Sequence, residues 1–281
     1  MTLIDELFDI EREAYKKSPV HSLDARVKMI LCLLGLLVTV LLPYTRIGNS
    51  VIAWPQIFAF AVIYMLFIGL YILSGASMRY YLVRLCLIMP FGLFFIILQP
   101  FFFNPYYEGY HILFTLPLGV NVYVESVIFA VSLFLKFVIS LSFIILLSAT
   151  TTMQKMTEGA ARLRVPRIFV TTLSLTVRYI FLFGLIFKKI QSSFSSRCFI
   201  SSGKGLPLKY RLTVIGNAAG SLFVRAIHQG EQTYTAMCCR GYSENSNMFT
   251  AKKPLAFTEW LFLGVGVFYI VVFPALVYLI F

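Results

Sequence analysis

Long apolar stretches that carry almost no charge constrain this chain more than any other feature. A stretch of about 18 or more largely uncharged residues can cross a bilayer as a helix. The chain has 281 residues, of which 59% are hydrophobic and only 13% are charged. A helix satisfies its own backbone hydrogen bonds in lipid, whereas an open sheet leaves its edges unpaired. The sequence therefore predicts an all-α polytopic membrane protein.

Five membrane spans are predicted, four of them in the first half of the chain and one at its end. They cover about residues 27–42, 51–73, 82–103, 122–149 and 257–281. The long section before the last span is more polar and carries two extended helical patterns. We therefore predict three parts. These are a membrane domain of four spans at 1–149, a cytoplasmic module with two long amphipathic helices at 150–256, and a C-terminal transmembrane helix at 257–281.

The distribution of lysine and arginine predicts how the chain is oriented. Five of these residues precede or begin the first span, and fifteen of the 24 lie between Lys155 and Lys253. Basic residues collect on the cytoplasmic side of membrane proteins. The N-terminus and the 150–256 module are therefore expected in the cytoplasm, and the C-terminus outside. This distribution also accounts for the net charge of +12 without a nucleic-acid partner.

One further apolar segment, residues 168–187, is open to two interpretations. It contains a single charge, Arg178, and is long enough for a span. However, Arg167, Thr171, Ser174 and Arg178 recur at helical steps, and such a polar stripe is typical of an amphipathic helix that lies on the membrane. A crossing here would also move the basic residues that follow it to the outside. We favour the in-plane helix, with the span as the alternative.

The two helices of the 150–256 module are predicted to end at arginines. The first pattern ends at Ser196-Arg197 and the second at Cys239-Arg240-Gly241. Glycine just after a helix lets the chain turn sharply, and an arginine there is favoured by the exposed carbonyl groups. A guanidinium can also donate two parallel hydrogen bonds to carboxylate or carbonyl groups of a partner. We predict that these five residues form a docking surface for another protein. For either arginine alone, lipid phosphate is the alternative partner.

Two features of the helices suggest internal contacts. Gly216, Ala219 and Gly220 form a small-residue patch, which lets another helix approach closely, so we predict that the two long helices cross there. Lys136 is a basic residue inside a predicted span, where charge is costly and usually has a role. Lys136 either lines a substrate path, or it pairs or hydrogen-bonds within the bundle or faces a wet cavity. We favour the second interpretation.

The sequence contains no recognisable catalytic or metal-binding constellation. His21, His111 and His228 lie in separate segments, and none has a cysteine or carboxylate at ligand spacing. The Gly203-Lys204-Gly205 segment lacks the rest of a phosphate-binding loop. The chain is therefore expected to hold no metal and no cofactor, to bind no ATP, and not to be an enzyme.

Several segments together resemble a known family, the transmembrane T subunit of energy-coupling factor (ECF) transporters, and most closely its cobalt-type branch CbiQ. The family carries Ala-Arg-Gly-like motifs at the ends of its coupling helices. Cys239-Arg240-Gly241 matches the second motif, and Ser196-Arg197-Cys198 keeps the arginine of the first. The other similar segments are Leu23-Asp24-Ala25-Arg26-Val27-Lys28, Arg162-Leu163-Arg164-Val165-Pro166-Arg167, and residues 216–223 and 234–237.

The resemblance implies partners and a mechanism. Two ABC-type ATPases would bind the arginine-ended helices, and their ATP-driven closure would move a separate substrate-binding membrane subunit. The substrate would be cobalt, with nickel or a vitamin as alternatives, and the location would be a prokaryotic cell membrane.

Two other classes of function are weighed against this one. A membrane-embedded enzyme acting on lipids would be expected to cluster Asp, Glu or His near the membrane surface, but the 12 acidic residues are spread thinly. A channel or secondary transporter would be expected to show internal repeats or several polar groups within its spans. Neither pattern is visible.

Overall fold

The computed structural model describes residues 14–16, 18–42, 54–101, 112–115, 121–163, 165–197, 207–243 and 254–280. The chain divides into two compact units. The helical bundle comprises Ile10–Gly159 and Lys253–Phe281, and the two-helix unit lies within Ala160–Lys252.

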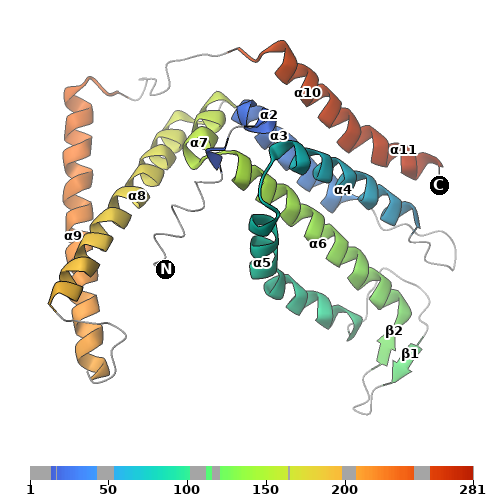
Figure 1. The fold of residues 1–281 in the computed structure, drawn as a ribbon, viewed down its shortest axis with the longest axis horizontal. Coiled ribbons are helices and arrows are strands. Elements are labelled where there is room, and N and C mark those ends of the chain that lie inside the picture. The colour runs from blue at the N-terminus through green and yellow to red at the C-terminus, as the bar shows by residue number, and fades with distance from the viewer. Residues whose placement is uncertain are drawn as a thin grey trace. The chain divides into compact units, whose positions relative to one another are not determined.

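Nearly all the described residues of both units are helical (Figure 1). The bundle contains α2 (Pro19–Ser22), α3 (Ala25–Leu41), α4 (Trp54–Ser74), α5 (Met78–Leu98), the 3₁₀ turn η1 (Gln99–Phe101), α6 (Val124–Thr150), α10 (Phe257–Val267), the π-helical turn η2 (Phe268–Val272) and α11 (Phe273–Ile280). The helix α7 (Met153–Arg162) follows α6. The two-helix unit contains α8 (Arg167–Ser196) and α9 (Leu208–Cys239).

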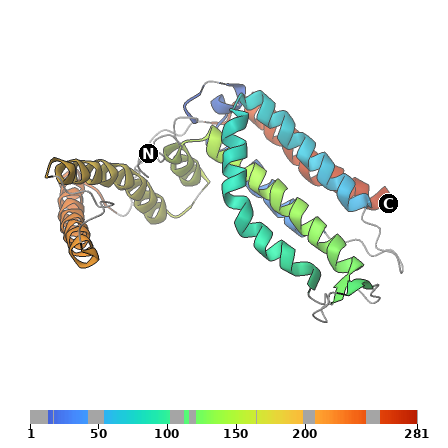
Figure 2. The ribbon, with the colours of Figure 1, turned by 60° about the horizontal axis from the view of Figure 1, so that its bottom comes forward.

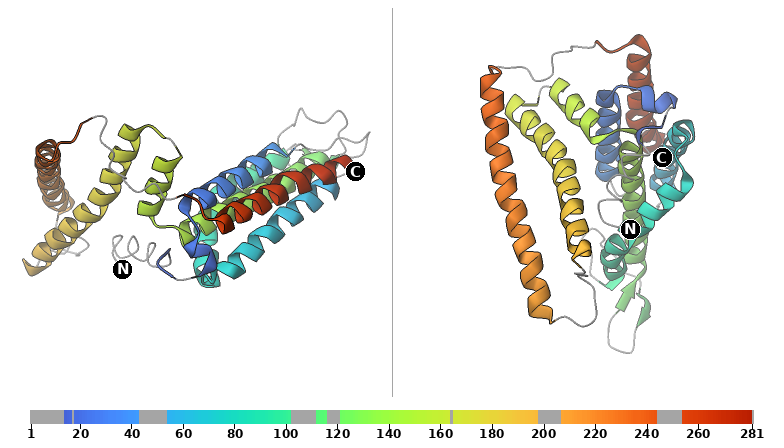
Figure 3. Two further views of the ribbon diagram at one scale, coloured as in Figure 1. Left: turned by 90° about the horizontal axis from the view of Figure 1, so that it is seen from above. Right: turned by 60° about the vertical axis from the view of Figure 1, so that its left-hand side comes forward.

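The helix α6 is the centre of the bundle, because α3, α4 and α5 all pack against it. Figure 3 shows α3, α4, α6 and the α10–α11 pair side by side. The core between them is rich in aromatic rings. The ring centroid of Phe67 lies 5.6 Å from that of Tyr81 and 6.1 Å from that of Phe143. The hydroxyls of Tyr81 and Ser142 share a hydrogen bond of 2.8 Å, as a buried tyrosine requires.

The helix α5 bends along its length (Figure 2), and Pro90 lies inside it. A proline removes one backbone donor and crowds the preceding turn, so the bend has a physical cause. The next turn lies close to α6. A Cβ atom added to Gly92 would stand 2.2 Å from the Phe137 ring. Glycine therefore permits the close approach of α5 and α6.

Two lysines join α3 and α6 in a reciprocal way. Lys136 on α6 donates from Nζ to the carbonyl groups of Val40 (3.1 Å) and Leu42 (2.8 Å), where α3 ends. Lys28 on α3 donates from Nζ to the carbonyl of Thr150 (3.0 Å), where α6 ends. The helices are antiparallel, so each supplies a cation to the other's C-terminus, where the helix dipole favours positive charge. The interpretation of Lys136 as a hydrogen-bond donor within the bundle agrees with this geometry.

Other basic side chains also gather at the C-terminal end of α6. His21 Nε2 donates to the carbonyl of Ala149 at 3.2 Å. Arg84 Nη1 donates to the Ser148 hydroxyl at 2.7 Å, and its guanidinium lies 4.2 Å from the centroid of the Tyr80 ring. The last turn of α6 is therefore held by basic side chains from α2, α3 and α5.

A carboxylate fixes the start of α10 to the start of α3. Glu259 Oε2 accepts the backbone N–H of Ala256 at 2.9 Å, which satisfies one unpaired donor of the first turn of α10. Its other oxygen, Oε1, accepts the backbone N–H of Asp24 at 3.0 Å. Asp24 in turn caps α3, because its carboxylate accepts the N–H of Arg26 at 3.2 Å.

Replacing Glu259 by alanine is expected to destabilise the bundle by about 1–2 kcal/mol. The backbone N–H groups of Asp24 and Ala256, at the starts of α3 and α10, would lose their hydrogen-bond acceptor. Thermal unfolding of the purified chain in detergent measures this loss. Glu259→Gln is the matched control, since its amide oxygen keeps one acceptor and it should lie between the alanine variant and the wild type. Equal stability of all three proteins would contradict this role.

Five described helices are long and apolar enough to cross a membrane: Ile57–Ser74, Met78–Phe101, Ser126–Thr150, Arg167–Ser196 and Phe257–Leu276. Four of them coincide with predicted spans, and the predicted helical membrane class is confirmed. The predicted first span, α3, has 17 residues, or about 25 Å of helix, at the lower end of spanning lengths. The fifth helix is α8. Length and composition allow it to span, so its in-plane position stays a prediction.

A short hairpin before α6 departs from the all-helical expectation. The strands β1 (Ile112–Thr115) and β2 (Asn121–Tyr123) pair antiparallel, with Thr115 opposite Asn121 and Ile112 opposite Tyr123. The residues of this hairpin are β-branched or aromatic at several positions, which favours an extended backbone.

Candidate functional site

The C-terminal end of α9 has the geometry of a Schellman motif. The N–H of Gly241 donates to the carbonyl of Cys238 at 2.9 Å, and the N–H of Tyr242 donates to that of Met237 at 3.0 Å. Gly241 has φ +78°, a left-handed conformation that glycine adopts without steric cost. The motif satisfies the last carbonyl groups of the helix and turns the chain away. Arg240 is left as the capping residue, with its side chain exposed.

The C-terminal end of α8 is simpler. Arg197 is the capping residue, with φ −94° and a backbone N–H that donates to the carbonyl of Phe194 at 3.0 Å. The hydroxyl of Ser196 donates back to the carbonyl of Ser192 at 3.0 Å, so its donor is already used within the helix. Arg197 is exposed. Cys198, the last residue of the first predicted motif, lies outside the described residues.

The described residues of α8 and α9 carry mostly positive charge. From Arg167 to Arg197 there are five basic residues and no acidic one. From Pro207 to Ser243 there are four basic residues and one acidic residue, Glu231. Neither Arg197 nor Arg240 forms an ion pair with another described residue; the ion pair among those residues joins Arg26 to Asp24. Both guanidinium groups are therefore available to a partner with acceptor groups.

Arg240 supplies the charge at its end of α9. The exposed side chain of Tyr234 is one turn from Cys238, and a hydrogen bond with that thiol is the main cause that raises the pKa of Tyr234 above its ordinary value. Among the described residues 234–243, Arg240 is the one charged side chain.

The contact between α8 and α9 lies away from the small-residue patch. The hydroxyl of Tyr179 on α8 donates to that of Thr233 on α9, and the Tyr179 ring stacks on Phe183 at 5.8 Å. By contrast, a Cβ added at Gly216 or Gly220 would meet no heavy atom within 4 Å, and Ala219 is exposed. The prediction that the helices cross at Gly216, Ala219 and Gly220 is therefore wrong within this chain. Small side chains permit a close approach but do not cause one.

Arg197 and Arg240 lie at opposite ends of the helix pair. The two helices run in opposite directions (Figures 1 and 3) and touch at Tyr179 and Thr233. With a rise of about 1.5 Å per residue, Arg197 lies about 27 Å beyond Tyr179 along α8, and Arg240 lies about 10 Å beyond Thr233 along α9. The two arginines point to two separate contact sites.

Gly220→Leu is expected to leave the unfolding temperature of the isolated chain unchanged or slightly higher, because its Cβ enters open space and glycine is a poor helix former. Gly92→Leu is the matched comparison. Its Cβ collides with Phe137, and such overpacking typically costs about 1–3 kcal/mol. A Gly220→Leu variant that unfolds as early as Gly92→Leu would contradict the observed contact.

The histidines have structural partners where the structure describes them. His21 bonds the end of α6, and His228 Nε2 lies 3.0 Å from the side-chain nitrogen of Gln232. His111 lies outside the described residues, as does the Gly203–Gly205 segment. Among the residues that are described, no group of three or more His, Cys, Asp or Glu is placed to hold a metal ion.

Sequence reasoning missed two parts of this arrangement. The Tyr179–Thr233 bond joins positions 54 residues apart, and neither residue stands out by type or spacing. Lys136 was singled out as a cation within a span, but Lys28 was not. Their reciprocal contacts depend on α3 and α6 being antiparallel neighbours, which no local pattern specifies.

Comparison with known proteins identifies the family. A match to the family model of CbiQ, described as a cobalt transport protein, covers residues 16–251. An uncharacterized protein of Methanocaldococcus jannaschii is 30% identical over 124 residues, which are 44% of this chain and 41% of that protein. The chain therefore aligns with less than half of that relative's length. Because the family model covers most of the sequence, including both arginine-ended helices, the chain belongs to the CbiQ family of transport components.

Proposed function

We propose that this chain is the T subunit of an ECF-type importer. In this role it passes motion from two ABC-type ATPases to a separate substrate-binding membrane subunit. One observation carries the proposal: two long helices each end at an exposed arginine, and the two arginines lie at opposite ends of the pair. A dimeric ATPase offers two equivalent sites, and two separated contacts fit such a partner better than a single one.

Each arginine is proposed to dock in one nucleotide-binding subunit. The planar guanidinium donates two parallel hydrogen bonds to carboxylate or backbone carbonyl groups of the partner. The exposed carbonyl groups at the end of its own helix also favour the cation there. Ser196, Cys239 and Gly241 shape the two helix ends, and Gly241 turns the chain out of the way of Arg240. ATP binding and hydrolysis are assigned to the partner chains, with no cofactor required in this one.

The bundle is proposed to anchor these helices, with residues 150–256 on the cytoplasmic side. The C-terminal end of α6 supports this orientation, because His21, Lys28 and Arg84 all gather there and basic residues favour the cytoplasmic side. The helix α7 follows directly from that end. An in-plane α8 would keep the basic residues after it on the same side of the membrane.

Cobalt is the proposed substrate, held by the partner subunit, with nickel or a vitamin as alternatives. The family name supports cobalt. The composition of this chain supports metal binding by the partner subunit, because its three histidines lie in separate segments and do not form a series of metal ligands.

Affinity purification of the tagged chain from its native membrane tests the proposal. Two ABC-type ATPase chains and one small membrane subunit are expected to co-purify, and the purified assembly is expected to take up radioactive cobalt into vesicles when ATP is supplied. Purification without any ATPase chain would contradict the proposed function. Uptake of nickel or of a vitamin in place of cobalt would revise the substrate alone.

A further inference from the structure

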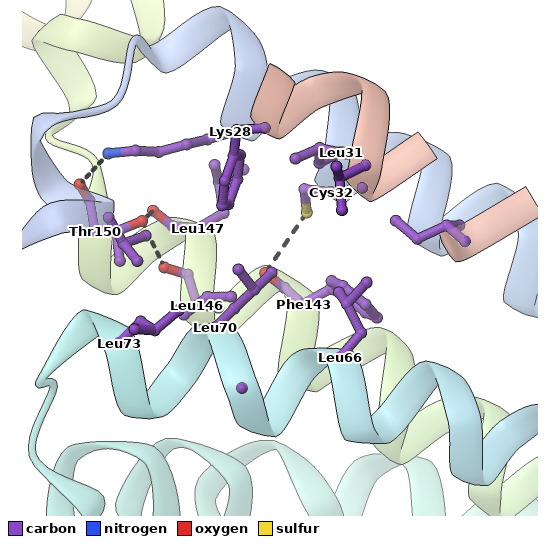
Figure 4. Close-up of a pocket in the computed structure, with 16 residues that line it drawn as sticks. Lys28, Leu31, Cys32, Leu66, Leu70, Leu73, Phe143, Leu146, Leu147 and Thr150 are labelled. Carbon is purple, nitrogen blue, oxygen red and sulfur yellow. Dashed lines mark hydrogen bonds between the residues drawn. The ribbon is translucent and has the colours of Figure 1, made fainter. Parts of the chain in front are cut away.

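An apolar groove of about 250 Å³ lies within the helical bundle, between α3, α4, α6 and the α10–η2 segment (Figure 4). Of the 16 residues that line it, 13 have purely hydrocarbon side chains or are glycine, and the remaining three are Lys28, Cys32 and Thr150. No carboxylate or imidazole lines the groove. These walls suit hydrocarbon and offer no ligands for a metal ion.

The mouth of the groove is continuous with outward-facing surfaces of two helices that are long and apolar enough to span the membrane. Leu73 on α4 and Val265 on α10 line the groove and are 55% and 60% exposed. Gly69 also lines it, and a Cβ added there would meet no heavy atom within 4 Å. In a bilayer, this mouth gives an acyl chain access to the groove.

One end of the groove is positively charged. Lys28 lies there and is held by the carbonyl groups of His21 (3.3 Å) and Thr150 (3.0 Å). The positive charge of Lys155 also acts on Lys28, and the carboxylate of Asp24 acts in the opposite sense. Lys155 is exposed, on the first turns of α7. An anionic group at this end of the groove would be attracted by both lysines.

We propose that the groove binds one acyl chain of an anionic phospholipid, with the phosphate beside Lys28 and Lys155. The hydrocarbon walls, the mouth open to lipid and the cationic end together fit an amphiphile of this charge and orientation. The lipid would bridge α3, α4, α6 and α10, which form the body of the bundle. This inference requires only that the bundle lies in a membrane, and it is independent of the ATPase docking.

Native mass spectrometry of the full purified chain tests the lipid site, with dioleoyl phosphatidylglycerol and dioleoyl phosphatidylcholine as probes. We expect one phosphatidylglycerol to be retained more tightly than phosphatidylcholine. Lys155→Gln should reduce this preference about fivefold, the effect of one basic residue near a charged lipid surface. Gly69→Leu should remove the tightly held lipid, because the leucine side chain occupies the groove. Gly264→Leu is the matched control, since its Cβ also meets open space and it does not line the groove.

A second measurement covers the case in which Gly69→Leu fails to fold. Cys32 lines the groove of the wild-type chain, so added phosphatidylglycerol should slow alkylation of Cys32, read by peptide mass spectrometry, more than phosphatidylcholine does. Alkylation of Cys32 at the same rate with either lipid or with none would overturn the site. Slowing by both lipids equally, with no effect of Lys155→Gln, would overturn the assignment of the phosphate.

Discussion

Lys136→Met is expected to lower the stability of the bundle by about 1–3 kcal/mol, the typical cost of leaving buried polar groups without a partner. Methionine has a similar length but no donor, so the carbonyl groups of Val40 and Leu42 lose the two bonds that Lys136 now makes. Within a bilayer, little water is available to donate hydrogen bonds to these carbonyl groups. Unfolding of the purified chain in detergent or in lipid nanodiscs, followed by circular dichroism, measures the change.

Leu133→Met on the same helix is the control for Lys136→Met, because a volume-conserving apolar exchange usually costs less than about 1.5 kcal/mol. Lys136→Met should also leave the two arginine-ended helices able to bind a partner, since these belong to the other compact unit. A Lys136→Met variant at least as stable as Leu133→Met would mean that desolvation of the ammonium outweighs its two hydrogen bonds.

Arg240→Ala is expected to impair substrate uptake strongly while the protein remains in the membrane. Loss of one partner of a buried charged contact costs about 2–5 kcal/mol, largely from the group left unpaired on the other side. Arg240→Lys should rescue uptake only in part, because an ammonium group keeps the charge but cannot donate the two parallel hydrogen bonds of a guanidinium. Radioactive cobalt uptake into cells, normalised to the amount of membrane-inserted chain, compares the three proteins. Full rescue by lysine would indicate a contact with lipid phosphate instead.

The helix ends were predictable from sequence because their causes are local. Gly241 favours a left-handed turn wherever it follows a helix, and the structure has that turn after Arg240. Pro207 likewise marks the start of α9, whose first residue is Leu208. Length and hydropathy also predicted most of the membrane helices, since crossing a bilayer requires a run of apolar residues whatever their neighbours are.

Contacts between helices were harder to predict, because they depend on which faces meet. The Gly216–Gly220 patch is compatible with a close crossing, but α8 contacts α9 through Tyr179 and Thr233 instead. Lys136 illustrates the same limit. Its position within a span showed that it needs acceptors, and only the neighbouring end of α3 specified which acceptors these are. Hydropathy likewise gives α8 the length and composition of a span without assigning its depth in the bilayer.

The most direct test of the central claim is the affinity of the purified chain for its ATPase pair, measured by biolayer interferometry in nanodiscs. Three proteins are compared: the wild type, the double variant Arg197→Ala/Arg240→Ala, and Arg225→Ala. Arg225 is an exposed arginine on α9 away from both helix ends and controls for loss of a basic residue. The account predicts that the double variant raises the Kd by about 30-fold or more, the equivalent of at least 2 kcal/mol, and that Arg225→Ala binds close to wild type. Wild-type affinity in the double variant would contradict the docking role of the two arginines.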